Sequence, residues 1–394
     1  MRQAYIIRPN KSPRVTPPYF LAAMNRFLEI DALRGLLLVL MVINHTPSPL
    51  RNLTNQPLGF VSAAEAFVFV SACLCGLVFG RRLHDGGLPE VRRLARRRAR
   101  QIYTGHVLTL LFCFVIVGQQ LGHLSPFYNM LHPYLEQPTN AAVSALLLFY
   151  QPPLLDILPM YLLFLLLTPF VLNMLVRAGF RPVLFVSLLL WLVAQSGLKE
   201  WLVGALADGW LVIAPGAFDL LAWQLLWVSG LFLGYRLQQQ RPKRAVLVLP
   251  SMPWPALVGV ALFFFCWRWS WIPIAVNHGD PGWLLDKWRL GPLRLLNFFA
   301  LLYLALWLGP YLAKALGSLK PLILIGRNTL PLFCLHVCFT ALAIGVIELY
   351  ALPDGWCYSI LTLQLALILG SSLILGKFSN NPPSDQVPAP SVRS

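Results

Sequence analysis

Charged residues are scarce in this chain, at 12% of its 394 residues, whereas hydrophobic residues make up 57%. Acidic residues are fewest, with 15 Asp and Glu against 31 Lys and Arg, so the formal net charge is +16. Soluble domains carry about 25% charged residues. The shortage of charge therefore argues against a soluble globular protein and predicts a polytopic membrane protein.

Other absences narrow the function further. The seven cysteines show no CxxC spacing, so we expect neither a zinc nor a redox motif, and no metal site. The sequence has no glycine-rich phosphate loop, no internal repeat and no second soluble domain. Its basic residues cluster in short loops between apolar runs, which is typical of membrane topogenesis and predicts no nucleic-acid partner.

The apolar segments predict an all-α fold, a polytopic membrane helical bundle with about ten transmembrane helices. We expect a cytoplasmic tail over 1–25, one integral domain over 26–378 and a disordered cytoplasmic tail over 379–394. An even number of crossings and the basic loops predict that both termini lie in the cytoplasm. The predicted spans are 27–47, 57–80, 102–122, 156–176, 182–197, 212–236, 245–265, 293–313, 328–349 and 357–376.

Two loops stand out by their charge. The loop from Arg81 to Arg100 is the most basic and is predicted to lie in the cytoplasm, with binding of anionic headgroups or cofactor phosphates as an open second role. The loop around 266–292 is the largest exception to the pattern. There Arg268, Lys287 and Arg289 fall on the predicted outer side.

The first apolar segment contains four ionisable side chains, Glu29, Asp31, Arg34 and His45. A charge near the bilayer centre costs about 2.5 to 3.5 kcal/mol on insertion scales, so these groups should face a polar interior. Arg34 and His45 are eleven residues apart, which on a helix is three turns plus roughly 20° and about 16 Å, so they share a face. Asp31 joins that stripe one turn from Arg34. The first helix is thus predicted to carry an acid, a cation and a base along one line.

The second apolar segment contains Glu65, which should also face the protein interior. A carboxylate near a histidine can orient the ring and stabilise the imidazolium that forms when it takes a proton. A structural ion pair that locks the first two helices together is the alternative for Glu65.

Later apolar segments contain further polar side chains that could line the same cavity. These candidates are Arg294, Arg327, Asn328 and His336. His336 is either a core histidine with satisfied hydrogen bonds or a functional histidine, and both interpretations stay open. Asp156 and Asp219 fit either a helix-terminal charge or a functional carboxylate, and His106 is interpreted as structural.

Tryptophans are dense between Cys266 and Trp288, with acids and amides among them. Indole faces of this kind stack on sugar rings. They also form the aromatic belt at a membrane interface, and both interpretations stay open.

Three stretches resemble a known family. Glu29 to Gly35, Ile43 to His45 and Pro57 to Phe69 together closely resemble the opening of the OpgC family, the osmoregulated periplasmic glucan succinyltransferases. The spacing from Arg34 to His45 is similar to the arginine, ten residues, histidine signature of the wider membrane acyltransferase-3 superfamily. The stretch from Gly326 to His336 is similar to that family's late helix. By length and helix layout, the resemblance extends over about 26–378.

The resemblance implies a multi-pass enzyme of the bacterial inner membrane. Such an enzyme takes an acyl group, most often succinyl in this family, from a cytosolic acyl-CoA and transfers it to hydroxyls of a periplasmic glucan. Its partners would be acyl-CoA, the glucan and membrane lipids, and a homo-oligomer is left open. No cofactor other than the acyl-CoA donor is implied.

The resemblance also implies roles for the candidate residues. His45 would be the general base or, as an alternative, a transient acyl carrier, and Asp31 and Glu65 would orient it. Arg34 would pair with anionic parts of the donor. Four further residues would help to bind the donor: Arg294, Arg327, Asn328 and His336.

Two other functions compete with this one. In a proton-coupled transporter or flippase, the same intramembrane ionisable groups would form a proton relay, but inverted repeats and matching broken helices are not found in the sequence. A structural or assembly subunit of a glucan-export machine would tolerate the loss of His45.

Overall fold

The computed structural model describes residues 28–206, 209–239, 254–272 and 282–380. Every regular element in this part of the chain is a helix, and the only pairing of strand type is an isolated bridge between Tyr150 and Ala214. The prediction of an all-α fold is therefore confirmed. The helices are α1 (Leu28–His45), α2 (Arg51–Thr54), α3 (Ala63–Leu111), the π-helical η1 (Phe112–Gly118), α4 (Gln119–Leu121), α5 (Ser125–Glu136), α6 (Pro138–Leu146), α7 (Ile157–Ala178), α8 (Phe180–Gln195), α9 (Leu198–Ala205), α10 (Leu220–Gln239), α11 (Trp254–Arg268), α12 (Gly282–Leu285), α13 (Pro292–Trp307), α14 (Gly309–Gly317), α15 (Lys320–Arg327), α16 (Thr329–Leu349) and α17 (Asp354–Asn380).

Five of the described helices are long and apolar enough to cross a membrane, or up to seven if each of two bent helix pairs counts as one span. The chain is thus a membrane protein, but the ten crossings predicted from the sequence are not confirmed. The five are Ala63–Leu121, α7, α10, α16 and the apolar part of α17, and the bent pairs are α8 with α9 and α13 with α14.

Three features of the helices explain why fewer spans are found than the sequence predicts. The helix α1 has 18 residues but carries Glu29, Asp31 and Arg34 among them. The described part of the predicted span 245–265 belongs to α11, which has only 15 residues. The spans predicted over 57–80 and 102–122 run within one helical stretch, Ala63–Leu121.

The helix α3 contains a break where the sequence predicts a basic loop. Gly87 has φ 69° and ψ −172°, a conformation open to glycine alone, and Pro89 follows two residues later. The segment around Arg81 to Arg100 is therefore helical on both sides of one non-helical residue. Val91, Ala95 and Ala99 are buried at four-residue spacing, while most of the arginines between them are exposed.

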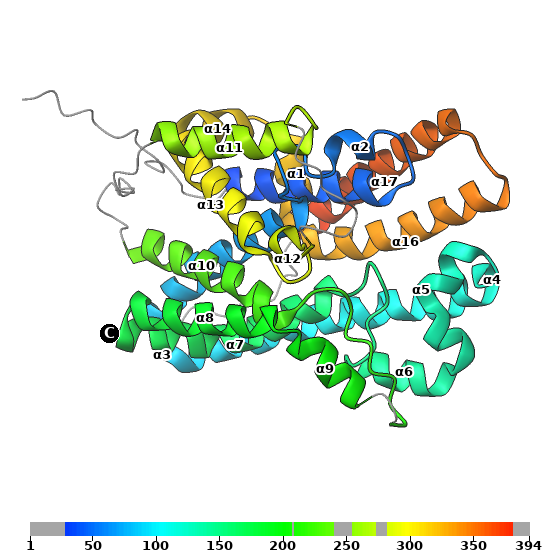
Figure 1. The fold of residues 1–394 in the computed structure, drawn as a ribbon, viewed down its shortest axis with the longest axis horizontal. Helices are drawn as coiled ribbons and strands as arrows, with labels where there is room; N and C mark the ends of the chain where they lie inside the picture. The colour runs from blue at the N-terminus through cyan, green and yellow to red at the C-terminus, as the bar shows by residue number, and fades with distance from the viewer. Residues whose placement is uncertain (1–27, 207–208, 240–253, 273–281, 381–394) are drawn as a thin grey trace, which may run out of the picture.

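The helix α3 is the central element of the bundle. It packs most extensively on α10 and α7 and also contacts α1 and α16. Figure 1 shows α7, α8 and α10 along one side of the molecule, with α11, α13 and α14 on the other. The main hydrophobic core joins residues of α1, α3, α7, α10 and α16.

The helix α1 is held against α15 by glycines. A Cβ at Gly326 would lie 1.7 Å from the Asp31 carbonyl oxygen, and one at Gly35 would lie 2.0 Å from the Leu322 carbonyl oxygen. Both backbones can approach this closely only because neither position carries a side chain. This contact fixes the stripe on α1 against the end of α15. The expectations for 1–25 and for most of 379–394 lie outside the described residues, and α17 ends at Asn380.

Candidate functional site

A cavity of about 1020 Å³ lies where α1 ends and where α3 and α7 begin. His45, the last residue of α1, is on its wall. The lining also includes Asn44, Ser62 and Phe333, together with side chains of α5, α9 and the segments 213–218 and 287–288. A volume of this size is at the upper end of the range for ligand sites. It is large enough for a sizeable substrate.

His45 is hydrogen-bonded to His336, a residue 291 positions later in the chain. The Nδ1 atom of His45 lies 2.9 Å from Nε2 of His336, and the two rings stack with centroids 5.1 Å apart. His336 is 1% exposed, and its Nδ1 lies 3.1 Å from the hydroxyl of Thr340, one turn further along α16. A buried row of three polar groups therefore ends at the cavity wall.

The row determines which ring nitrogen of His45 can react. If the Nδ1 proton of His336 goes to Thr340, then Nε2 of His336 accepts the Nδ1 proton of His45. This assignment is inferred from the hydrogen bonds, because proton positions are not observed directly. It leaves Nε2 of His45 without a proton and free to take one from a ligand in the cavity.

Asn44 presents a second polar group to the same cavity. Thr54 donates a hydrogen bond of 2.6 Å from its hydroxyl to Oδ1 of Asn44. With the amide oxygen engaged, the amide nitrogen of Asn44 is the group available to a ligand. The capping residue of α3, Ser62, is on the wall nearby.

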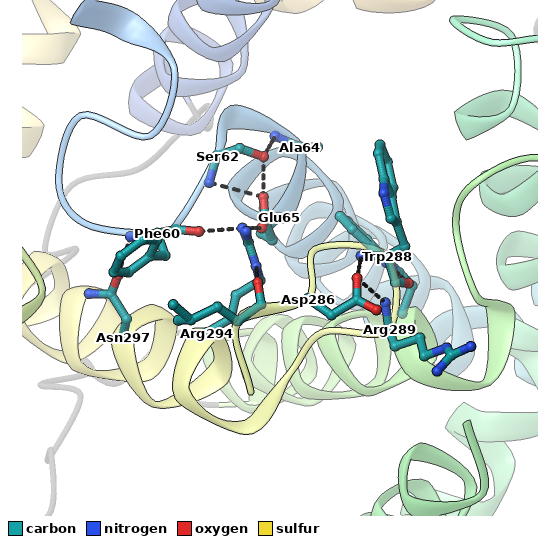
Figure 2. A network of polar contacts seen from close by, with 11 residues as sticks. Phe60, Ser62, Ala64, Glu65, Asp286, Trp288, Arg289, Arg294 and Asn297 are labelled. Carbon is teal, nitrogen blue, oxygen red and sulfur yellow. Dashed lines mark hydrogen bonds and ion pairs between the residues drawn. The ribbon is translucent and has the colours of Figure 1, made fainter. Parts of the chain in front are cut away.

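Glu65 belongs to a separate buried network that holds the start of α3 (Figure 2). One oxygen, Oε1, lies 2.6 Å from Nη1 of Arg294, and the two side chains are 0% and 4% exposed. The other oxygen, Oε2, accepts hydrogen bonds from the backbone N–H of Ser62 at 3.0 Å and from the Ser62 hydroxyl, which completes a capping box.

Arg294 extends this network to two loops. It donates to the carbonyl oxygens of Phe60 and Leu285, the latter at 3.0 Å, and Asn297 one turn later accepts the N–H of Phe60 at 2.8 Å. Figure 2 shows Ser62 and Arg294 directed at Glu65, Asn297 beside Phe60, and the segment from Asp286 to Arg289 near Arg294. The geometry supports a structural ion pair for Glu65, the alternative to a functional role. The partner is Arg294 of α13, however, and not a residue of α1.

The structure corrects the prediction that Asp31 and Glu65 orient His45. Asp31 is fourteen residues from His45 in the same helix, which is about 21 Å. Both oxygens of Glu65 are engaged in its own network. The hydrogen bond that orients His45 comes instead from His336, for which the functional interpretation is the one that the geometry supports.

Asp31, Arg34 and Arg327 form a second cluster, at the other end of α1. Oxygens of Asp31 lie 4.0 Å from Nη1 of Arg34 and 3.9 Å from Nε of Arg327. The Arg34 guanidinium lies 5.9 Å from the centroid of the Phe67 ring, and its buried Nε has no hydrogen-bond partner among the described residues. Asn328 bonds to the Leu324 carbonyl at the end of α15. None of these residues lines the cavity of His45.

A second, smaller cavity has a volume of about 130 Å³. Arg98, Tyr161 and Ser71 are among its lining residues, and the Ser71 hydroxyl is buried without a hydrogen-bond partner in the described structure. Phe67, over which Arg34 lies, is also on its wall. Ile157 and Phe333 line both cavities, so the two adjoin each other.

The other aspartates have distinct surroundings. Asp219 accepts the backbone N–H groups of Leu221 and Ala222 and thus caps α10, which is the helix-terminal role. Asp156 is on the wall of the large cavity and accepts the N–H of Ala217 at 3.1 Å. Burial raises the pKa of the Asp156 carboxyl, and the hydrogen bond from Ala217 partly opposes that shift.

Comparison with known protein families identifies the chain. The family model for the OpgC protein matches residues 26–378, which is most of the sequence. The chain belongs to the OpgC family. No curated protein and no solved structure matches it.

Membership in the OpgC family indicates a role in the modification of osmoregulated periplasmic glucans and an enzyme of the acyltransferase type. The resemblance of the chain to the OpgC family is thereby confirmed. Among the described residues, no group of three or more His, Cys, Asp or Glu side chains is arranged to hold a metal ion.

Sequence reasoning missed three features of the site in this OpgC family member. Thr340 follows His336 by one helical turn, which is a visible but weak signal. Lys287 and Glu200 both line the large cavity. Lys287 had a stronger signal, because it belongs to the loop that breaks the positive-inside pattern.

Proposed function

We propose that this chain is a membrane O-acyltransferase that transfers an acyl group, most readily succinyl, from a cytosolic acyl-CoA to hydroxyls of a periplasmic glucan. The observation that carries the proposal is the His45 ring on the wall of the large cavity, hydrogen-bonded from behind by the buried His336. Histidine is the side chain whose ordinary pKa best suits proton transfer near neutral pH.

The reaction follows from this arrangement. Nε2 of His45 takes the proton of an acceptor hydroxyl as that oxygen attacks the thioester carbonyl carbon. The new C–O bond forms, the C–S bond breaks, and the departing CoA thiolate takes the proton back from His45. His336 accepts the Nδ1 proton of His45 in a hydrogen bond and stabilises the imidazolium between these steps.

Charge on the carbonyl oxygen needs a hydrogen-bond donor in the transition state. The amide nitrogen of Asn44 is the donor best supported, because Thr54 holds the amide oxygen and both Asn44 and His45 line the cavity. Arg34 lies eleven residues from His45, or about 16 Å along the helix, which is too far for this role.

The donor is proposed to approach from the cluster of Arg34 and Arg327, through the small cavity. Arg98 lines that cavity, and Arg34 lies over Phe67 on its wall, so cations are available for the phosphates of CoA. The adjoining walls of the two cavities offer a route from this end to His45. The spacing of Arg34 and His45 also supports placing the family in the membrane acyltransferase-3 superfamily. An inner membrane location with cytoplasmic termini is part of the same proposal.

The test is thioester consumption by the purified chain in lipid nanodiscs. With succinyl-CoA and a periplasmic glucan, we expect release of free CoA and a matching mass gain on the glucan. His45→Ala should lower the rate by about a hundred- to ten-thousandfold. His123→Ala, at an exposed histidine that does not line the cavity, should leave it unchanged.

Two results would contradict the proposal. An unchanged rate in His45→Ala would remove His45 from the chemistry. Movement of glucan across the bilayer without any release of CoA would favour a transporter or flippase instead.

A further inference from the structure

Four side chains of Asp, Glu, Lys or Arg line the large cavity, and three of them are already engaged. Asp156 accepts the N–H of Ala217. Lys199 donates to the carbonyl oxygens of Gly216, Ala217 and Phe218, at 2.6, 3.0 and 3.4 Å. Glu200 lies 2.8 Å from Nη2 of Arg289. The fourth is Lys287.

Lys287 has neither a hydrogen bond nor an ion pair among the described residues. Among the described residues it makes a cation–π contact with the Trp288 ring, whose centroid lies 4.8 Å from Nζ. Glu65 and Asp156 are near enough to act on its charge, but neither carboxylate forms an ion pair with it in the described structure. Both oxygens of Glu65 are engaged by Arg294 and Ser62, and Oδ2 of Asp156 accepts the N–H of Ala217. Burial lowers the pKa of the Lys287 ammonium, and the Glu65 carboxylate partly opposes that shift.

The backbone that carries Lys287 is held in place. Asp286 accepts the N–H of Trp288 at 2.7 Å, and the Trp288 carbonyl accepts from the indole of Trp223 at 2.9 Å. On the next residue, the Arg289 carbonyl accepts from Gln195 at 2.8 Å. The ammonium is thus presented on a fixed turn, which lowers the entropy lost when a ligand binds.

A half-buried cation that has no ion-pair partner among the described residues, such as Lys287, is stabilised when a ligand supplies the opposite charge. In the proposed reaction, the ligand that shares this cavity places its acyl carbonyl at His45, and Lys287 lines the same cavity. An acyl chain that ends in a second carboxylate would satisfy both groups at once.

We propose that Lys287 binds the free carboxylate of a dicarboxylic acyl group and so selects succinyl and its homologues over uncharged acyl donors. This inference rests on the proposed acyltransferase function. It assigns acyl selectivity to a residue of the segment between α12 and α13, far in sequence from the histidine pair. Charge-assisted recognition of this kind is worth about a ten- to hundredfold preference.

The experiment compares two donors that differ only in charge. Succinyl-CoA and its amide analogue succinamoyl-CoA have the same length, and both are offered to wild type, Lys287→Met, Lys287→Arg and Lys320→Met. Lys320→Met is the control, because Lys320 is an exposed lysine of α15 outside both cavities. We expect Lys287→Met to raise KM for succinyl-CoA about ten- to hundredfold, with KM for succinamoyl-CoA unchanged and Lys287→Arg close to wild type.

Equilibrium binding provides a readout that needs no turnover. Stabilisation of the protein against heat by each CoA ester reports affinity directly. Wild type should bind succinyl-CoA more tightly than succinamoyl-CoA, and Lys287→Met should bind the two equally.

The outcomes separate the two proposals. An equal loss of kcat with both donors in Lys287→Met would mean that Lys287 stabilises the oxyanion or the fold, and would overturn the selectivity assignment. So would an unchanged preference for succinyl-CoA. If wild type transfers neither acyl group, the proposed function fails instead, and the binding preference still decides whether Lys287 recognises the carboxylate.

Discussion

In the proposed reaction the group that takes the proton is one atom, Nε2 of His45, and its protonation depends on the neighbouring His336. His336 is fully buried and stacks on the His45 ring, so it fixes both the position of the ring and the nitrogen that keeps its proton. A carboxylate in this position would attract the imidazolium more strongly. A neutral histidine gives the same orientation without placing a net charge inside the bilayer, where charge is costly.

At this scale we predict the effect of removing the second histidine. His336→Leu leaves the Nδ1 proton of His45 without an acceptor, so kcat should fall about ten- to hundredfold while KM for the donor stays close to wild type. His336→Gln, which can accept through its amide oxygen, should recover part of the loss. Turnover of succinyl-CoA measures both variants.

His106→Leu is the matched control for that prediction. His106 is 1% exposed like His336, but neither of its ring nitrogens has a hydrogen-bond partner in the described structure. We expect its replacement to leave kcat unchanged. Equal losses in both leucine variants would contradict a specific role for His336.

Among the helices, the buried pair of Glu65 and Arg294 joins the first turn of α3 to α13 and to the loops on either side. It keeps Ser62 and the segment before α13 in place around the cavity. The network thus acts on the site through the position of its walls, since neither Glu65 nor Arg294 lines the cavity itself.

The prediction at this scale concerns stability. Glu65→Gln leaves the Arg294 charge buried without its counter-ion, so the free energy of unfolding should fall by about 3 to 5 kcal/mol. Glu65→Met combined with Arg294→Met removes both charges. This double variant should be clearly less destabilised than Glu65→Met alone or Arg294→Met alone. Unfolding by denaturant in detergent micelles, followed by tryptophan fluorescence, measures the difference.

A surface pair provides the comparison. Glu90 and Arg93 form an exposed ion pair on α3, and Glu90→Gln should not change unfolding measurably. If the losses of the two buried single variants simply added in the double variant, the pair would not be coupled, and this account of α3 would be wrong.

The molecule as a whole separates the cavity of His45 from the basic segment around Gly87. Ser62 is on the cavity wall, and Gly87 breaks the same helix 25 residues later. That length of helix is about 37 Å, which is slightly more than the hydrocarbon thickness of a bilayer. The cavity of His45 and the arginines around Gly87 should therefore lie on opposite sides of the membrane.

Cysteine labelling in intact cells tests this arrangement. On a background with the seven native cysteines replaced, Glu200→Cys at the cavity wall should react with a membrane-impermeant maleimide from the periplasm. Arg97→Cys should react only after the inner membrane is permeabilised. Reaction of both from the same side would contradict the proposed topology.

The parts of this structure that follow from local sequence could be predicted, and contacts across the chain could not. The helical fold and the exceptional character of His45 follow from the apolar run around them, because charge in such a run is costly wherever it occurs. The partner of His45 is 291 residues away, and nothing in the spacing of His336 indicates which helix it faces. Glu65 shows the same limit, since its burial is predictable while its pairing with Arg294 depends on how α13 packs.

The predicted number of spans is not confirmed, for a different physical reason. Hydropathy identifies apolar segments but does not show where a helix bends, as between α8 and α9, or that a basic stretch is helical on both sides of a single break, as at Gly87 in α3. Lys287 is the opposite case. The sequence places this lysine on the predicted outer side, against the positive-inside pattern, and the structure places it on the cavity wall.

Ile157 and Phe333 are the two side chains common to both cavities. In the proposed orientation, the large cavity lies toward the periplasm and the small one toward the cytoplasm, so these two side chains lie where the proposed route passes between compartments at different electrical potential. A bacterium cannot leave such a path open to protons without dissipating the gradient that drives its ATP synthesis. In the proposed route, an acyl chain passes between this phenylalanine ring and this isoleucine. The two side chains would then have to return to contact before water enters behind the acyl chain.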